Sequence, residues 1–193
     1  MNCLKGSVTR EMIRKLKSIL DEVIYIFCNY FICYIPIWGI RKILYQMLGM
    51  KIGKGSRILM KTIVVHPWKI VIGKKTYVNE YCFLDGRGGI SIGENVTIAI
   101  FSKLITGYHN IDDESFSYLE EPIIIEDNSA VFTNVTVLPG VHIREGCIVT
   151  AGAVVKRGEY KEFCVYGGNP IKHIRDRKVK KFDISGSWKP LFR

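Results

Sequence analysis

An aliphatic side chain returns at every sixth position along most of this 193-residue chain, and no other feature restricts the fold as strongly. Two-residue insertions at 70–71 and 90–91 and one long insertion after residue 104 interrupt the series without changing its spacing. A helix face needs a repeat of about 3.6 residues, so a repeat of six excludes an amphipathic helix. The fifteen repeating positions are Ile52, Ile58, Val64, Ile72, Val78, Leu84, Ile92, Ile98, Leu104, Ile125, Val131, Val137, Ile143, Val149 and Val155.

The insertions fall between groups of three hexads, so eighteen residues form the natural unit. A slim residue such as Ser56, Thr76 or Cys147 usually follows each anchor by four positions, where it leaves room for a corner. We therefore predict an all-β domain over residues 51–171, a parallel β-helix of about five triangular coils with inward-pointing anchors. Residues 1–50 are expected to form a helical N-terminal extension, and residues 172–193 a short basic C-terminal tail.

Composition limits the partners and the compartment. The hydrophobic content of 48% supports a sizeable core, and the formal net charge of +10 indicates an anionic partner. Nucleic acid, an acidic membrane surface and a phosphorylated small molecule all fit that charge. The six cysteines include no CxxC pair and no clustered histidine, so we expect buried thiols in a reducing cytoplasm and no metal site.

The N-terminal extension holds "VIYIFCNYFICYIPIWGI", residues 23–40, which carries no charge but includes Pro36 and Gly39. Its flanks, "REMIRKLK" and "RKILYQMLGMK", are basic and amphipathic. These features suit a helical hairpin lying on a membrane surface, which would make the protein peripheral to the inner membrane face. They suit equally a helical cap packed on the body or on a neighbouring subunit. A true membrane span is the less favoured interpretation.

The long insertion begins directly after a histidine. Residues 110–124 are polar and acidic, and His109 closes the third coil where they leave the stack. A rigid coil would hold this side chain beside a wall able to cover a substrate. Histidine suits general-base catalysis because its side chain titrates near neutral pH. A solvated turn histidine is the alternative, and the residues by themselves do not separate the two.

The chain resembles the hexapeptide-repeat acyltransferases, which fold as a left-handed parallel β-helix. The resemblance covers about residues 50–177 and depends on the hexads and on "TGYHN", "LPGVHI", "TAGAVV" and "GGNPIKHI". It is nearest to the maltose, galactoside and xenobiotic O-acetyltransferase group, which includes polysaccharide-biosynthesis members. It implies a homotrimer that transfers an acetyl group from acetyl-CoA to a hydroxyl of a sugar or glycan precursor. The acceptor is a small molecule or, in view of the N-terminal segment 23–40, a lipid-linked glycan.

The resemblance also implies roles for single residues. His109 matches the family's catalytic base. Candidates for acceptor binding are Asn79 in "YVNEY" and Asp85 and Arg87 in "LDGRGG". Candidates for binding acetyl-CoA are Thr133 and Ala151 on the pantetheine side, and Lys156, Lys172 and Arg175 on the phosphate side. The chain departs from the family's pattern by its lysines at 156 and 172, where relatives carry Thr or Arg, and by Ile171 in place of the commoner Ala after Pro170.

Other functions remain to be weighed. An N-acyltransferase acting on an amino sugar and a non-catalytic hexapeptide-repeat protein share this fold. A zinc carbonic anhydrase also shares it, but the four histidines include no closely spaced pair to match its ligand motif. The basic segment "RDRKVKK" comes with no nucleic-acid recognition motif, so we expect no nucleic-acid partner.

Overall fold

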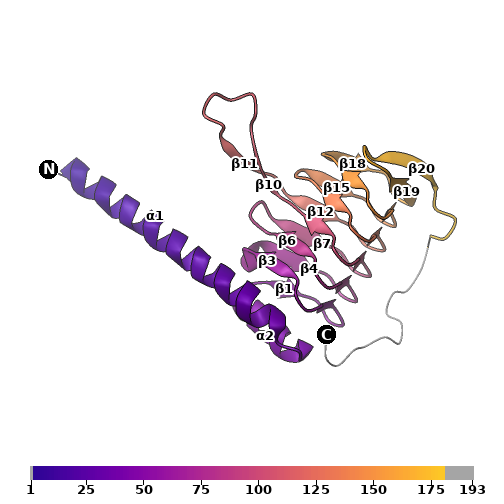
Figure 1. The fold of residues 1–193 in the computed structure, drawn as a ribbon, viewed down its shortest axis with the longest axis horizontal. Coiled ribbons are helices and arrows are strands. Elements are labelled where there is room, and N and C mark those ends of the chain that lie inside the picture. Colours follow the sequence, from indigo (N-terminus) through magenta and orange to yellow (C-terminus); the bar gives the residue numbers. More distant parts are fainter. Residues whose placement is uncertain (1, 181–193) are drawn as a thin grey trace.

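Three sheets form the sides of a triangular column in the computed structural model, which describes residues 2–180, with side chains from residue 10 onward (Figure 1). Sheet A contains β1 (Lys51–Ile52), β4 (Ile70–Ile72), β7 (Ile90–Ile92), β12 (Ile123–Ile125), β15 (Val141–Ile143) and β18 (Gly158–Tyr160). Sheet B contains β2 (Arg57–Ile58), β5 (Tyr77–Val78), β8 (Thr97–Ile98), β13 (Ala130–Val131), β16 (Ile148–Val149), β19 (Cys164–Gly167) and β20 (Lys172–Asp176). Sheet C contains β3 (Ile63–Val65), β6 (Phe83–Asp85), β9 (Lys103–Leu104), β14 (Thr136–Val137) and β17 (Val154–Val155).

The chain visits the three sheets in turn, so each circuit is one coil of a parallel β-helix. We name its corners by the sheets they join: the A–B, B–C and C–A corners. Within the three sheets, described neighbours pair in parallel, except that β20 runs antiparallel to β19. The predicted β-helix is confirmed.

The predicted anchors form the interior of the column. All fifteen are buried, and even the most accessible of them, Ile52, is 7% exposed. The strand register stacks anchor on anchor, as in the pairs Ile72 with Ile92 and Val131 with Val149. Each coil therefore covers the apolar side chains of the coil before it, and burial of this continuous column stabilises the fold.

The slim residues lie inside the corners and join consecutive coils. The hydroxyl of Thr76 donates a hydrogen bond of 2.7 Å to the Gly93 carbonyl and accepts one of 3.1 Å from the Val96 amide. Ser102 donates to the Phe132 carbonyl at 2.9 Å in the same way. Corner backbone leaves carbonyl groups without a strand partner, and buried polar groups are costly unless paired. The slim residue thus supplies a hydrogen bond as well as space.

The column has a sixth coil beyond the five that the hexads predict. Its inward positions belong to Tyr160 and Tyr166, which pair with Ile143 and Val149 and are 8% and 9% exposed. The two rings meet edge to face with centroids 5.1 Å apart. An aliphatic six-residue pattern could not reveal this coil, because its inward residues are aromatic and the step from Val155 to Tyr160 is five. Large rings close the end of the column over the last aliphatic layer.

Helices close the opposite end. The N-terminal segment forms α1 (Asn2–Ile26), a π-helical turn (Phe27–Phe31), a 3-10 turn (Ile32–Tyr34) and α2 (Trp38–Met47). The buried residues Cys28, Ile32 and Tyr45 join the core of the column. The Asn29 side chain accepts from the Val64 amide at 2.8 Å and donates to the Val64 carbonyl at 2.9 Å, which satisfies the edge strand β3. Residues 28–50 are therefore a cap, whereas most of α1 projects beyond the column (Figure 1).

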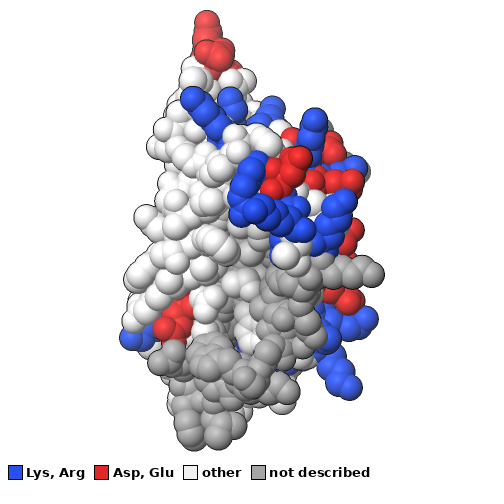
Figure 2. All heavy atoms as spheres, turned by 90° about the vertical axis from the view of Figure 1, so that its right-hand side faces the viewer, with Lys and Arg blue, Asp and Glu red and all other residues white. Residues whose placement is uncertain are grey.

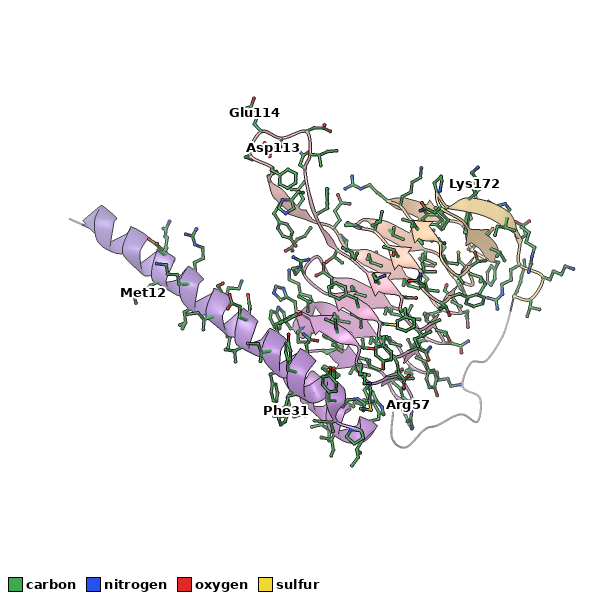
Figure 3. All side chains as sticks on the ribbon, viewed as in Figure 1. Met12, Phe31, Arg57, Asp113, Glu114 and Lys172 are labelled. Carbon is green, nitrogen blue, oxygen red and sulfur yellow. The ribbon has the colours of Figure 1, made fainter. Side chains whose placement is uncertain are left out.

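The long insertion is a β-hairpin. β10 (Gly107–His109) and β11 (Tyr118–Glu120) pair antiparallel, and the hairpin projects from the side of the column near its middle (Figure 1). Figure 3 shows Asp113 and Glu114 at its tip. The chain rejoins sheet A at β12, so the excursion leaves the register of the other coils intact.

We expect the buried anchors to carry much of the stability. Ile92→Ala should lower the free energy of unfolding by about 2–5 kcal/mol, since it removes buried methyl groups and leaves a cavity. Ile92 is 1% exposed in the middle of the column. Chemical denaturation followed by circular dichroism measures the change.

Ser91→Ala is the matched control, because Ser91 precedes Ile92 in β7 and points outward. It should leave the unfolding curve almost unchanged. Equal losses in the two variants would contradict the assignment of inward and outward faces.

Candidate active site

His109 lies at the C–A corner, where the hairpin leaves the column. It ends β10 and pairs with Tyr118 of β11. Gly107, two residues earlier, allows this pairing because a Cβ there would meet the Tyr118 hydroxyl oxygen at 2.2 Å. The glycine of "TGYHN" thus makes room for an aromatic side chain next to the imidazole.

Three contacts fix the imidazole. Its Nδ1 lies 2.8 Å from the Phe116 carbonyl oxygen. The Phe116 ring stacks on it at a centroid distance of 4.5 Å with planes 7° apart, and the Tyr118 ring meets it edge-on at 5.4 Å. His109 itself is exposed. The hairpin therefore orients the ring, and Nε2 forms no hydrogen bond with any residue that the structure describes.

Asp85 lies beneath the hairpin and holds its base. Its side chain is 0% exposed, and it accepts hydrogen bonds from the Thr106 amide at 3.1 Å and the Gly107 amide at 3.3 Å. Arg87 adds two bonds, from Nε at 2.7 Å and Nη2 at 2.9 Å. Burial opposes the charge, but the bonds from Arg87 and the backbone outweigh it and lower the pKa of Asp85. The ionised carboxylate fixes the backbone two residues before His109.

Arg87 extends from this pair toward the imidazole. Its guanidinium lies 5.3 Å from the centre of the Tyr118 ring, a cation–π contact. Lys69 and Glu120 form an ion pair beside it, with Nζ and Oε2 3.5 Å apart. Because the Tyr118 ring also touches His109, the C–A corner brings together an imidazole, a guanidinium and an aromatic ring.

The acidic residues of the hairpin have partners other than the imidazole. Asp113 accepts from Ser115, from its amide at 3.1 Å and from its hydroxyl at 2.8 Å. Glu121 accepts from the Tyr108 hydroxyl at 2.9 Å and pairs with Arg157. A backbone carbonyl, rather than a carboxylate, therefore orients His109.

Asn79, Thr133 and Ala151 lie at a different corner. All three follow strands of sheet B, so they form a column along the B–C corner. Thr133 and Ala151 are exposed, and the hydrogen bond of 2.9 Å from the Gly152 amide to the Thr133 carbonyl stacks their coils. Asn79 is half-buried, and its side-chain amide donates to the Ile98 carbonyl at 3.0 Å.

The three predicted phosphate-binding cations are all exposed. Lys156 follows β17 at the C–A corner, and Lys172 and Arg175 belong to β20. Lys172 pairs with Gly167 at the B–C end of sheet B, and Figure 3 shows its side chain at the outer edge of the column. Figure 2 shows Lys and Arg gathered with Asp and Glu over this end of the molecule.

A cavity of about 560 Å³ opens in the same region. It lies beside β18, β19 and the segment after β20, and none of the three predicted cations lines it. Its walls carry both basic and acidic side chains, so the cavity does not have the purely basic lining expected of an anion-binding site. The lining residues are Arg144, Glu159, Lys161, Glu162, Phe163, Cys164, Asp176, Arg177 and Lys180.

The histidines do not gather. His142 Nε2 pairs with Glu126 at 2.6 Å, and the His66 ring stacks on Trp68 at 4.7 Å. Among the described residues one group of three metal-ligand types comes together: Cys164, His173 and Asp176, with ligand atoms within 4.8 Å. The three side chains contact one another directly: His173 Nε2 and Asp176 Oδ1 are 3.2 Å apart, and Cys164 Sγ and Asp176 Oδ1 are 3.5 Å apart.

The structure thus groups the predicted residues in two sets. His109, Asp85 and Arg87 share the C–A corner, whereas the other predicted acceptor residue, Asn79, shares the B–C corner with Thr133 and Ala151. Sheet C separates the two corners. Sequence reasoning missed Phe116 and Tyr118 as contacts of His109, because only the register of the hairpin brings them to the ring.

Comparisons with known proteins identify the class to which this β-helix belongs, the hexapeptide acyltransferases. Residues 122–157 match the family model described as the hexapeptide repeat of succinyl-transferase. A colanic acid biosynthesis acetyltransferase of Escherichia coli (strain K12), named WcaF, is 34% identical over 137 residues, covering 71% of this chain and 75% of that protein. The chain therefore belongs to the hexapeptide-repeat acyltransferase family.

Two solved structures are similar in fold and sequence. A hexapeptide-repeat acetyltransferase of Vibrio cholerae in complex with acetyl coenzyme A matches with a TM-score of 0.68 and 28% identity over 73% of this chain and 78% of that one. A maltose O-acetyltransferase of Clostridium difficile matches with a TM-score of 0.68 and 26% identity over 72% and 75%. Both similarities extend over most of the β-helix.

Asp85 provides a test of the corner. Asp85→Asn should lower the free energy of unfolding by about 1–3 kcal/mol, because buried amide donors lose an ionised acceptor. We also expect acyl transfer to fall, because the Thr106–Gly107 backbone sets the position of His109. Denaturant unfolding and acyl-transfer rates measure the two effects.

The effect on stability should depend on pH. The pKa of Asp85 is lower in the folded than in the unfolded protein, so its contribution is complete above about pH 4 and disappears as the pH falls through the folded value. Asp127→Asn is the control, since this exposed corner carboxylate also accepts a backbone hydrogen bond, from Glu94 at 2.7 Å. Equal behaviour of the two variants would contradict the role given to Asp85.

Proposed function

We propose that this protein transfers an acetyl group from acetyl-CoA to a hydroxyl of a sugar or glycan precursor, directly and with His109 as general base. Family membership supports acyl transfer. The acetyl coenzyme A bound by the Vibrio cholerae relative supports the donor, and the maltose O-acetyltransferase supports a sugar hydroxyl as acceptor. The name of the Escherichia coli relative supports a role in polysaccharide biosynthesis.

The observation that carries the proposal is the hydrogen bond between His109 Nδ1 and the Phe116 carbonyl at 2.8 Å. A carbonyl oxygen can only accept, so Nδ1 holds the hydrogen. In the neutral imidazole Nε2 then keeps a free lone pair. The hairpin therefore selects the tautomer that a general base needs and holds it at an exposed corner.

The reaction balances with this single base. The acceptor hydroxyl oxygen attacks the thioester carbonyl carbon while Nε2 takes the hydroxyl proton. A carbon–oxygen bond forms, the carbon–sulfur bond breaks, and the proton held on Nε2 passes to the departing thiolate of CoA. Neutral imidazole is restored, and no other reactant is consumed.

The cysteines argue against a covalent acyl-enzyme. A thiol needs a low pKa to be a good nucleophile. Burial raises the pKa of Cys28, Cys82 and Cys147 to about 12. It also raises the pKa of Cys33 and Cys164. All the described thiols are thus poor nucleophiles, which supports direct transfer.

In this proposal the acceptor binds between Arg87 of one subunit and Asn79 of a neighbouring subunit, and Asp85 positions the His109 corner from beneath. The donor lies along Thr133 and Ala151, with its phosphates near Lys156, Lys172 and Arg175. The exposure of these three cations supports that role, since a phosphate can reach them without displacing a buried ion pair.

A homotrimer would complete the site. His109 and the donor-side column lie at different corners of one subunit, on either side of sheet C. If the C–A corner of one subunit faces the B–C corner of the next, the imidazole and the thioester share one groove. Two exposed rings on the B–C corner, Tyr81 and Phe101, lie with their centroids 5.4 Å apart and their planes tilted by 32°, and that neighbour would cover them.

An N-acyltransferase acting on an amino sugar is the second candidate. It is favoured by a dTDP-4-amino-4,6-dideoxy-D-glucose acyltransferase of Escherichia coli, which is 26% identical over 175 residues and matched over 91% of its length. For either reaction we propose a cytoplasmic location, peripheral to the inner membrane face. The buried free thiols are consistent with a reducing compartment.

Catalysis by His109 can be tested with a panel of acceptors. His109→Ala should lower the turnover of acetyl-CoA by about 10²–10⁴-fold, the usual contribution of a general base. The panel contains neutral sugars, amino sugars, nucleotide sugars and lipid-linked glycans, and release of the CoA thiol measures the rate. Turnover with hydroxyl acceptors supports O-transfer, whereas turnover confined to amino sugars selects the second candidate.

His142→Ala is the matched control, because this histidine pairs with Glu126 on the outside of sheet A. It should keep the wild-type rate. Unchanged turnover in a folded His109→Ala protein would refute the general base, and no turnover of any acyl donor by the wild type would favour a non-catalytic protein.

The shared site can be tested by mixing subunits. His109→Ala and Ala151→Trp should each inactivate a homotrimer, the first by removing the base and the second by blocking the donor groove. A random equimolar mixture should regain about one quarter of the wild-type activity, because about three quarters of its trimers contain both variants and one of the three interfaces in each of these combines two intact halves. Each variant alone serves as the control, and mixtures without recovery would show that one chain holds the whole site.

A further inference from the structure

One side of α1 carries a continuous apolar stripe. Each member lies three or four residues from another member, the spacing that lines up side chains on one helix face. Leu16 is 70% exposed and Leu20 is 56% exposed. The whole stripe consists of Met12, Ile13, Leu16, Ile19, Leu20, Val23, Ile26 and Phe27.

A different side of the same helix meets the column. Asp21 lies 3.8 Å from His66, Ile24 packs against the core, and Cys28 is buried within it. At about 100° per residue these positions point away from the centre of the stripe. Figure 3 shows Met12 and Phe31 on the side of the helices that faces away from the β-helix. Folding of the chain on itself therefore leaves the stripe uncovered.

A contiguous apolar surface of this size is unfavourable in water, and such patches usually mark interaction sites. Exposed apolar residues continue beyond α1 along the cap, with Phe31 at 64%, Ile43 at 59% and Met47 at 77%. Among the described residues no helix combines the length and apolar character needed to cross a membrane. The apolar residues of α1 and of the cap are therefore suited to lying along a flat surface rather than to spanning a bilayer.

The charged residues beside the stripe indicate which kind of surface would cover it. Lys15 and Lys17 lie at the two margins of the stripe, where their side chains could reach past the apolar residues toward anionic groups. Arg10 and Arg14 add two more cations on the polar side, and the single acidic residue among positions 10–20 is Glu11. A second copy of the chain carries the same net charge of +10 and would repel this segment, whereas an anionic surface attracts it.

The width of the stripe argues further against a coiled coil with a second copy. Met12, Leu16, Ile19 and Val23 would fill a coiled-coil seam. A further column, Ile13, Leu20 and Phe27, widens the stripe on one flank, while the other flank carries Lys15 and Glu22. A helical partner covering the seam would leave the additional column exposed. A flat apolar layer covers both.

We propose that the stripe of α1 binds the surface of an anionic phospholipid bilayer, with the helix parallel to the membrane plane and its lysines at the headgroups. This inference deepens the proposed function, because it carries the acyltransferase to the surface where lipid-linked acceptors lie. Binding is measured without turnover, so the two proposals fail separately.

The test is co-sedimentation of the full chain with vesicles of phosphatidylethanolamine and phosphatidylglycerol. Leu16→Gln with Leu20→Gln should weaken binding about tenfold or more, since two side chains no longer enter the apolar layer. Glutamine keeps the helix propensity of α1. Ser18→Gln with Tyr25→Gln, on the opposite face, is the matched control and should bind as the wild type does.

Two further measurements address charge and catalysis. Arg14→Gln with Lys17→Gln should weaken binding to anionic vesicles, and high salt or neutral phosphatidylcholine vesicles should do the same to the wild type. His109→Ala should bind fully. The proposal is overturned if the Leu16 and Leu20 variant binds as the wild type does. It is also overturned if that variant alters the mass of the assembly without vesicles, because a protein partner would then cover the stripe.

Discussion

Stacking of inward aliphatic side chains is the interaction on which this molecule depends. Each strand has two to five residues, too few to hold a sheet by itself, so every coil is stable because its neighbours cover its anchors. The regular register also fixes the corners in space, one above another. A residue placed at a corner therefore has a defined position relative to the corners of the coils above and below it. The columns of site residues follow directly from that regularity.

The interior polar residues adapt this apolar column to its corners. In a column with only aliphatic side chains, the buried carbonyl groups at the corners would have no hydrogen-bond donor, and burying a polar group without a partner is costly. Serine, threonine and cysteine at the slim positions return those hydrogen bonds to the next coil, as Ser56 does toward Gly73 at 2.5 Å. A hydrogen bond of the same kind occurs at the base of the hairpin, where the Thr106 hydroxyl donates to the Asp85 carbonyl at 2.7 Å. The corner that carries His109 is thus a modified version of the ordinary corner.

The six-residue period was sufficient to predict the β-helix, its anchors and the place of the long insertion, because those features repeat. Features that occur only once in the chain could not be predicted from this period. The sixth coil has tyrosines at its inward positions, and the hairpin brings Tyr118 to His109 through a pairing that no periodicity encodes. The sequence also left open whether the N-terminal segment is a cap or a surface helix. The structure assigns the cap to the part around Cys28 and Tyr45, and leaves the face containing Leu16 uncovered.

The two ends of the column differ in a way that bears on how such an enzyme meets its substrates. One end is closed by helices whose outer surface is apolar and whose projecting segment is basic, and the other is closed by tyrosines and β20 beneath a mixture of charges (Figures 1 and 2). His109 lies between them on the side of the column. In the proposed reaction a donor with several phosphates would be attracted to cations near the β20 end, whereas an acceptor carried by lipid would arrive from the helical end. The hairpin, fixed at its base by Asp85, would then stand where the two routes meet.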